Sequence, residues 1–406
     1  MYIKRHIESV IENSKDTYPA VLVTGPRQVG KSTVLKNLYP SFKYETLDDP
    51  FLLQTIKIDP VGYLKLQGTP FIIDEVQRAP ELFLSLKYII DSNKHDGMYL
   101  LTGSHNFELM NGVSESLSGR ISIINMLGLS NREIYQDAFN EPFIPTNDYL
   151  INRKTSIKID LKALWNRIHK GSMPRLYDND KVDWEKYYSD YVNTYIERDI
   201  QKLEQVGDTM SFLQFMVALA SRTGELLNMN SLAQDVGISA PTIKKWISIL
   251  QKSNIIYLLQ PFSLNINKRI VKTPKIYFTD TGLVCYLCKW LTPETLMNGA
   301  MSGGIYETFV VSELLKSYYN AGKEPNLYFF RDTNGLEIDV VIYQNGSLYP
   351  IEIKKTSSPN IKDIKSFKAL ESYFPTLKIA EGGIICNYDK LLPLAENNKV
   401  IPVTFI

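Results

Sequence analysis

Gly25-Pro26-Arg27-Gln28-Val29-Gly30-Lys31-Ser32 fits the pattern G-x-x-x-x-G-K-[ST] at every fixed position, and this motif predicts the fold of the first third of the chain. An apolar segment typical of a buried strand precedes it, and a helical pattern follows it. Its glycines let backbone N–H groups turn inward around a phosphate, and the N-terminus of the next helix adds positive partial charge. We predict a phosphate-binding loop made of Gly25, Pro26, Arg27, Gln28, Val29, Gly30, Lys31, Ser32 and Thr33.

Acidic residues at the end of a second apolar segment predict how a bound nucleotide reacts. Lys31 is expected to reach the β- and γ-phosphates of ATP or ADP, and the Ser32 hydroxyl to bind Mg²⁺. About forty residues later, Phe71-Ile72-Ile73 leads into Asp74 and Glu75. We expect Asp74 to hold Mg²⁺, directly or through water, and Glu75 to orient and polarise the attacking water. The alternative is a strand capped by two solvated acids.

Two further polar positions are candidates for the catalytic machinery. A third apolar segment leads into Thr102, Ser104 and Asn106, one of which is expected to sense the γ-phosphate; the sequence leaves open which one. Arg120 stands directly before a further apolar segment. It is expected either to stabilise transition-state charge, within its chain or across the interface of a homo-oligomer, or to pair with a surface acid.

The N-terminal pattern favours a parallel sheet covered by helices, because short apolar segments alternate with helical patterns up to about residue 130. The predicted strands are Ala20–Thr24, Lys43–Leu47, Pro70–Asp74, Met98–Thr102 and Ile121–Leu127.

The motifs and their order resemble the AAA+-type ATPase domain of a widespread prokaryotic family whose members carry a second, C-terminal region. The resemblance rests on GPRQVGKS (25–32), YETLDD (44–49), FIIDEVQ (71–77), LLTGSHNF (100–107) and LSGR (117–120). GSMPRLY (171–177), YVNTYIERDI (191–200) and KIYFTDTGL (275–283) resemble the second region. The resemblance implies bound ATP or ADP, and a sheet in which the sensor strand separates the Asp74 strand from the phosphate-loop strand. It implies no substrate.

Residues Ser231–Leu250 predict a helix–turn–helix. Gly237 marks the turn, and the second helix carries apolar residues at i, i+3, i+4 and i+7, which form one buried stripe: Ile243, Trp246, Ile247 and Leu250. Segments 255–261 and 275–279 are the expected strands of a winged helix. Between residues 236 and 279 there are seven basic residues and no acidic one: Lys244, Lys245, Lys252, Lys268, Arg269, Lys272 and Lys275. We expect them to contact the phosphates of double-stranded DNA. The alternative is a module that packs domains together or binds a protein partner.

Asn345-Gly346 predicts a two-residue hairpin turn between segments 336–343 and 348–354. With that turn, Asp339 lies directly opposite Glu352, and Lys354 projects from the same face. Like charges at opposed positions destabilise a sheet, and a bridging divalent cation is the simplest compensation.

The Asp and Glu-x-Lys pattern resembles the active site of restriction-endonuclease-like enzymes, the PD-(D/E)xK group. The resemblance implies that Asp339 and Glu352 bind Mg²⁺, that Lys354 is the catalytic lysine and that Glu307 is the helical acid. Ile338, where that group often has proline, departs from the pattern. The alternatives are an inactive descendant that binds DNA, and two solvated acids at a hairpin edge.

Composition excludes several classes of protein. The chain has 406 residues, with 45 Lys and Arg against 44 Asp and Glu, so any nucleic-acid surface has to be local. Three cysteines are too few for a disulfide framework, and no segment resembles a signal peptide or membrane helix. We expect a cytoplasmic protein.

The spacing of Tyr187, Tyr188, Tyr191 and Tyr195 predicts helix packing.

The predicted fold class is α/β: an AAA+-like P-loop NTPase domain (1–140), a helical region (141–228), a winged helix (229–297) and an α+β nuclease-like domain (298–406). The first functional hypothesis is an ATPase that acts on DNA through the winged helix and the nuclease-like domain. The second is a nucleotide-dependent switch or scaffold whose nuclease-like domain cuts nothing.

Overall fold

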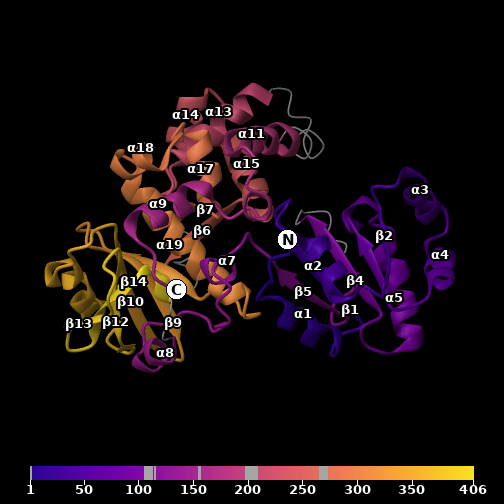
Figure 1. Cartoon of the computed structure of the whole chain (residues 1–406), viewed down its shortest axis with the longest axis horizontal. Coiled ribbons are helices and arrows are strands. Elements are labelled where there is room, and N and C mark those ends of the chain that lie inside the picture. The colour runs from indigo at the N-terminus through magenta and orange to yellow at the C-terminus, as the bar shows by residue number, and fades with distance from the viewer. Residues whose placement is uncertain (1, 105–112, 114–115, 154–156, 197–208, 265–272) are drawn as a thin grey trace.

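The computed structural model describes residues 2–104, 113, 116–153, 157–196, 209–264 and 273–406. Figure 1 shows the N-terminal segment as one body and the rest of the chain gathered beside it. No helix in these ranges is long and apolar enough to cross a membrane.

The N-terminal body is built on a parallel sheet of five strands in the order β2-β3-β4-β1-β5. The strands are β1 (Ala20–Gly25), β2 (Lys43–Thr46), β3 (Phe71–Asp74), β4 (Tyr99–Ser104) and β5 (Ile121–Asn125). All five predicted strands are present, with β5 ending two residues early. Strand β4, which carries the candidate sensor residues, separates β3 from the phosphate-loop strand β1, which confirms the order that the resemblance implied.

Helices cover both faces of this sheet, so its strands β1 and β3 are buried along their whole length, whereas the edge strand β2 is polar and at most half-buried. Val21 and Val23 of β1 share a buried cluster with residues of α1 and α2, whereas Leu22 shares another with residues of α3, α4 and α5. The helices are α1 (Glu8–Lys15), α2 (Lys31–Leu38), α3 (Pro50–Ile58), α4 (Pro60–Gln67) and α5 (Leu82–Asn93), with a 3₁₀ turn η1 (Val76–Arg78).

Helices dominate the middle of the chain. They are α7 (Asn131–Ile134), α8 (Asn147–Arg153), α9 (Leu161–Lys170), α10 (Arg175–Asp178), α11 (Trp184–Tyr191), the π-helix η2 (Val192–Ile196), α13 (Thr209–Ala220), α14 (Met229–Val236), α15 (Ala240–Lys252), α17 (Thr281–Leu287), α18 (Pro293–Asn298) and α19 (Ser302–Tyr319). Tyr187, Tyr188 and Tyr191 are buried and in ring contact, so these three tyrosines pack as predicted. The side chain of Tyr195, the fourth, lies outside the described residues.

The two helices of the predicted helix–turn–helix are α14 and α15. Gly237 ends α14 in the left-handed backbone region (φ +75°), and the Ser239 side chain caps α15. The predicted apolar stripe of α15 is buried, and the Trp246 ring contacts Phe212 and Phe215 of α13 at 5.0 and 5.3 Å between ring centroids.

A nine-stranded sheet joins the following strands to the C-terminal ones, in the order β13-β14-β12-β10-β9-β8-β6-β7 with β11 beside β10. Its strands are β6 (Ile256–Pro261), β7 (Lys275–Phe278), β8 (Leu327–Arg331), β9 (Glu337–Gln344), β10 (Ser347–Lys354), β11 (Lys378–Ile379), β12 (Gly382–Cys386), β13 (Leu392–Ala395) and β14 (Asn398–Pro402). The 3₁₀ helices η3 (Ile361–Lys368) and η4 (Val403–Phe405) and α20 (Ala369–Tyr373) complete this part. The predicted boundary between residues 297 and 298 thus separates strands that share one sheet.

The hairpin formed by β9 and β10 has the predicted register. Gln344 pairs with Ser347 and Val340 with Ile351, and Asn345 and Gly346 both have positive φ angles. The next opposed positions are Asp339 and Glu352.

Candidate functional site

The phosphate loop joins β1 to α2 through backbone conformations that need glycine. Gly25 has a φ of +148°, and a Cβ atom there would overlap the carbonyl oxygen of Met126, which follows β5. Gly30 precedes α2 with a φ of +96°, in the left-handed region that favours glycine. The two fixed glycines of the motif are therefore required by the geometry of the loop.

Lys31 lies against the carbonyl groups at the start of the loop. Its side chain is buried, and its Nζ donates to the carbonyl oxygens of Pro26 at 2.8 Å and Gly25 at 3.2 Å. This ammonium group is the one expected to meet the nucleotide phosphates.

Asp74 collects hydroxyl groups from three other elements of the N-terminal body. Its Oδ1 accepts from the Ser32 hydroxyl at 2.7 Å and from Thr102 of β4, and its Oδ2 accepts from the Tyr44 hydroxyl of β2 at 2.6 Å. Burial, with the hydrogen bond to Asp74, raises the pKa of Tyr44, which keeps its hydroxyl a donor. Of the three candidates for sensing the γ-phosphate, Thr102 is thus the one whose side chain donates to Asp74. Asn106 and the Ser104 side chain lie outside the described residues.

Glu75 directly follows β3 with a strained backbone. Its φ is +58°, a conformation that costs a non-glycine residue about 1–2 kcal/mol, and its half-buried side chain accepts a hydrogen bond from the Gln77 amide. Such strain is typical of functional sites, where surrounding structure holds it in place.

Arg120 lies at the opposite end of the sheet from the phosphate loop. Ile121 pairs with Ala20, at the start of β1, about 17 Å from Gly25 along the strand. The Arg120 guanidinium group donates to both carboxylate oxygens of Asp91, at 2.6 and 3.1 Å. A catalytic role for Arg120 at the nucleotide site of its own chain is therefore wrong, and the surface ion pair is what the structure has. A role across a homo-oligomer interface stays a prediction.

The residues around the loop fit ATP or ADP with Mg²⁺. The Ser32 hydroxyl and the Asp74 carboxylate, 2.7 Å apart, are oxygen ligands of the kind that Mg²⁺ takes together with nucleotide phosphates. The backbone N–H groups of the loop, in which Gly30 is left-handed, supply hydrogen-bond donors, and Lys31 supplies the positive charge that phosphates need.

A second group of ionisable side chains lies on the β9–β10 hairpin, near the start of β9 and the end of β10. Asp339 and Glu352 are 8% and 4% exposed, and the Ile353 N–H donates to Asp339 at 2.8 Å. Lys354 Nζ lies 2.9 Å from Glu352 Oε2 and 3.6 Å from Asp339 Oδ2. The register thus brings together the three residues that resemble the PD-(D/E)xK pattern.

A buried lysine from another part of the sequence completes this carboxylate cluster, which comprises Glu307, Glu337, Asp339, Glu352, Lys275 and Lys354. Lys275 begins β7, and its Nζ lies 3.0 Å from Glu307 Oε1, 2.5 Å from Glu337 Oε1 and 4.0 Å from Asp339 Oδ1. Its predicted contact with DNA phosphates is therefore wrong, because its charge is 4% exposed and paired within the chain.

The charges of this cluster are compensated within the chain by lysine ammonium groups. Burial, and then the charge of Asp339, raise the pKa of Glu307 to about 7 and that of Glu352 to about 9. Glu307 accepts from Lys275 and from the Tyr277 hydroxyl at 2.6 Å. No set of three or more His, Cys, Asp or Glu side chains among the described residues is arranged to hold a metal ion. The compensation that opposed acids require comes from Lys354 and Lys275.

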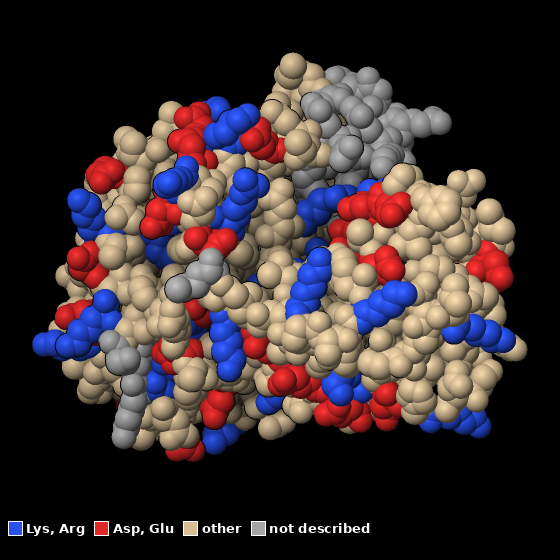
Figure 2. Space-filling model, turned by 45° about the vertical axis from the view of Figure 1, so that its right-hand side comes forward, with Lys and Arg blue, Asp and Glu red and all other residues tan. Residues whose placement is uncertain are grey.

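The basic side chains expected on the DNA-binding face are spread over different environments. Lys244 and Lys245 of α15 are exposed, whereas Lys252 is half-buried. Lys268, Arg269 and Lys272 lie outside the described residues. Figure 2 shows Lys and Arg interspersed with Asp and Glu over the face that it presents, with no broad basic surface among the coloured residues.

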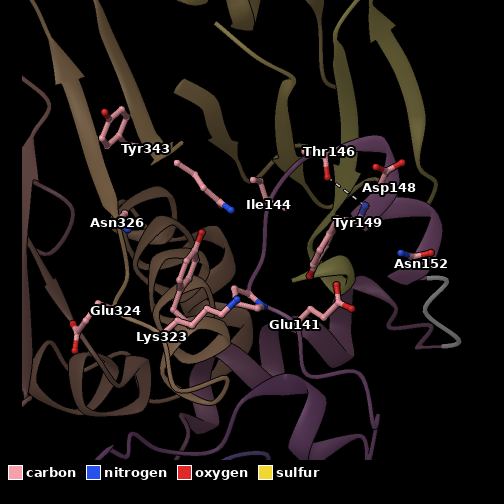
Figure 3. A pocket seen from close by; sticks show the side chains of 13 residues that line it. Glu141, Ile144, Thr146, Asp148, Tyr149, Asn152, Lys323, Glu324, Asn326 and Tyr343 are labelled. Atoms are coloured by element: carbon pink, nitrogen blue, oxygen red, sulfur yellow. Dashed lines mark hydrogen bonds between the residues drawn. The ribbon is translucent and has the colours of Figure 1, made fainter. Parts of the chain in front are cut away.

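A pocket of about 750 Å³ that sequence reasoning missed lies between residues 141–152 and 318–344. Figure 3 shows polar side chains from both segments around it, among them Asp148, Tyr149 and Lys323. Its residues come from segments about 170 residues apart and form no motif, so the sequence carried no signal for it.

Comparisons with known proteins support the N-terminal assignment. Residues 17–135 match the model of an AAA domain, and residues 161–294 and 302–406 match two domains of unknown function, DUF8612 and DUF4143. The chain is 28% identical to an uncharacterized protein of Mycobacterium tuberculosis over 95% of this chain and 80% of that protein. It is 22% identical to an uncharacterized protein of Methanocaldococcus jannaschii, over 80% and 74% of the two chains. A Walker-type ATPase of Pyrococcus abyssi is similar at 16% identity and a TM-score of 0.43, over 70% of this chain and 96% of that one. The motifs, the sheet order and the AAA match together make the N-terminal part a P-loop ATPase domain.

Proposed function

We propose that this protein binds ATP with Mg²⁺ at the loop 25–33 and hydrolyses it. The observation that carries the proposal is the position of Asp74, which accepts a hydrogen bond from the Ser32 hydroxyl of the loop while Thr102 and Tyr44 donate to its two oxygens. An acid fixed in this way is prepared to bind a metal ion at the start of α2 without reorganisation.

The chain's own groups divide the work of hydrolysis. Bound Mg·ATP supplies the electrophilic phosphorus and the metal charge. Lys31 exchanges the carbonyl oxygens of Gly25 and Pro26 for phosphate oxygens, so its ammonium remains paired throughout. Ser32 and Asp74 would hold the metal ion. Glu75, adjacent to Asp74, orients a water molecule and accepts its proton.

Steady-state ATP hydrolysis with variants at two positions tests this function. Lys31→Ala is expected to abolish nucleotide binding, because it removes the only lysine of the loop. Glu75→Gln is expected to bind ATP as wild type does but to lose turnover by a factor of about 10²–10⁴, the usual contribution of a positioned general base. Hydrolysis that persists in Glu75→Gln would remove Glu75 from this role.

For the C-terminal half, we propose a nucleotide-dependent regulatory or scaffolding function in place of metal-dependent DNA cleavage. The observation that favours it is Lys275, whose charge lies among the carboxylates that a nuclease would offer to a metal ion. Contact of α15 with duplex DNA remains part of the proposal, supported by the exposed Lys244 and Lys245.

Incubation of wild-type protein with linear and supercoiled DNA in Mg²⁺ or Mn²⁺ separates these functions. If the C-terminal half has the regulatory or scaffolding function, the DNA should stay intact at every metal concentration. Cleavage by wild type that is lost in Asp339→Ala would instead establish the nuclease.

A further inference from the structure

Arg5 is a buried cation that precedes α1 and belongs to none of the motifs above. It is 3% exposed, and its guanidinium donates in three directions. Nε binds Glu133 Oε1 at 2.9 Å, one terminal nitrogen binds the carbonyl oxygen of Val29 at 2.9 Å, and the other binds that of Leu127 at 2.8 Å. Val29 belongs to the phosphate loop, and Leu127 follows β5.

The contact with Val29 fixes one peptide plane of the loop. In a trans peptide the C=O and the next N–H point in opposite directions, so holding the Val29 oxygen on the Arg5 side turns the Gly30 N–H to the other side. Gly30 has the left-handed conformation that lets successive N–H groups converge on an anion. We propose that Arg5 is a positioning residue of the phosphate loop, which orients the Gly30 N–H toward the nucleotide phosphates. This inference rests on the proposed nucleotide binding.

The surroundings of Arg5 hold it in this place. Burial alone would raise the pKa of Glu133, but the charge of Arg5 and the N–H of Ser130 hold that pKa below its ordinary value, so Glu133 stays ionised. The backbone N–H of Arg5 itself donates to Glu8 at 2.7 Å, and that of His6 donates to Glu133 at 2.9 Å.

The contacts of Arg5 and Glu133 continue into the rest of the chain. Glu133 belongs to α7, which lies between the N-terminal body and the remainder in Figure 1. The N–H of Asn131, also in α7, donates to Glu313 Oε2 of α19 at 2.7 Å. Arg5 therefore connects the phosphate loop to the helix through which the N-terminal body meets α19.

A planar guanidinium suits this position better than an ammonium. Its fixed fork reaches a carboxylate and two carbonyl groups at once, whereas a lysine would offer a single charged nitrogen on a flexible stem. Arg5→Lys should therefore keep the positive charge near Glu133 but lose the bond to Val29.

Arg153 provides a matched control, because it is equally buried and makes the same kinds of bonds away from the loop. Its side chain binds Asp137 at 2.8 Å and the carbonyl oxygens of Thr404 and Phe405 at 3.0 and 3.3 Å. Arg5→Met and Arg153→Met should consequently lower the melting temperature to similar extents.

The test is titration calorimetry of the full-length chain with Mg·ADP. Arg5→Met is expected to raise the Kd at least tenfold and Arg5→Lys at least threefold, while Arg153→Met stays within twofold of wild type. An Arg5→Met Kd equal to that of Arg153→Met would overturn the inference. If Arg5→Met fails to fold, Arg5→Lys decides alone, since an unchanged Kd in that variant overturns it too. Absence of binding in wild type would instead refute the proposed function.

Discussion

Replacing Lys275 with methionine tests whether the carboxylate cluster is a self-compensated ionic network. The substitution preserves the aliphatic stem and removes the ammonium that lies 3.0 Å from Glu307 and 2.5 Å from Glu337. Removing one partner of a buried ion pair costs about 3–5 kcal/mol, because the remaining charge is left uncompensated. The loss should be local to β9, β10 and the start of α19.

The loss should grow with pH. The pKa of Glu307 is raised to about 7, first by burial and then by Asp339, so the folded state binds this proton more tightly than the unfolded chain does. Its contribution to stability is complete below its ordinary pKa, near 4.5, and is lost as pH rises through about 7. Removing Lys275 raises that pKa further, so the variant loses up to about 1.4 kcal/mol more per pH unit above 7 for this carboxyl group.

Amide hydrogen exchange of β9 and β10 peptides at pH 6 and pH 8 measures this effect, because it reports local opening in a chain of several parts. Lys186→Met, which breaks the exposed pair of Lys186 with Asp190, is the control and should leave exchange in these peptides unchanged. Adding 10 mM Mg²⁺ should not protect wild-type β9 and β10. Equal exchange in Lys275→Met and wild type at both pH values, or strong protection by Mg²⁺, would show that Lys275 does not compensate these carboxylates.

Three further outcomes are expected. Glu75→Gln should accumulate bound ATP, seen as nucleotide retained through rapid desalting; release of ADP at the wild-type rate would contradict it. Gly25→Ala should lower the melting temperature and abolish nucleotide binding, because the added Cβ overlaps the carbonyl oxygen of Met126; wild-type affinity in a calorimetric titration would show that the loop tolerates it. If α15 contacts DNA, the double variant Lys244→Ala, Lys245→Ala should weaken duplex binding uniformly across sequences and reduce the slope of log K against log salt by about 1–2 in fluorescence anisotropy; an unchanged slope would locate the interface elsewhere.

Local patterns predicted the elements that position the nucleotide site. The P-loop motif, the five strands and the Asn345-Gly346 turn follow from residues adjacent in sequence, and the turn alone sets the β9–β10 register. The order of the N-terminal strands depends on long-range pairing, and it came from the resemblance of the motifs.

The rest of the site depends on contacts between distant segments. Lys275 lies on β7, which pairs with β6, and β6 in turn pairs with β8. This second pairing brings Lys275 to the carboxylate cluster, and it has no local signature in the sequence. One signal was available: Lys275 begins a short strand that is otherwise apolar, and a lysine buried in such a strand requires carboxylate partners. Arg5 and Arg120 are single cations whose partners, Glu133 and Asp91, only the folded structure brings near.

Titration calorimetry of the full-length protein with ATP in the presence of Mg²⁺, beside Lys31→Ala, tests the nucleotide site most directly. Wild type should bind one nucleotide per chain saturably, and the variant should bind none. No binding to wild type, or equal binding to both proteins, would contradict the assignment of loop 25–33 as a nucleotide site.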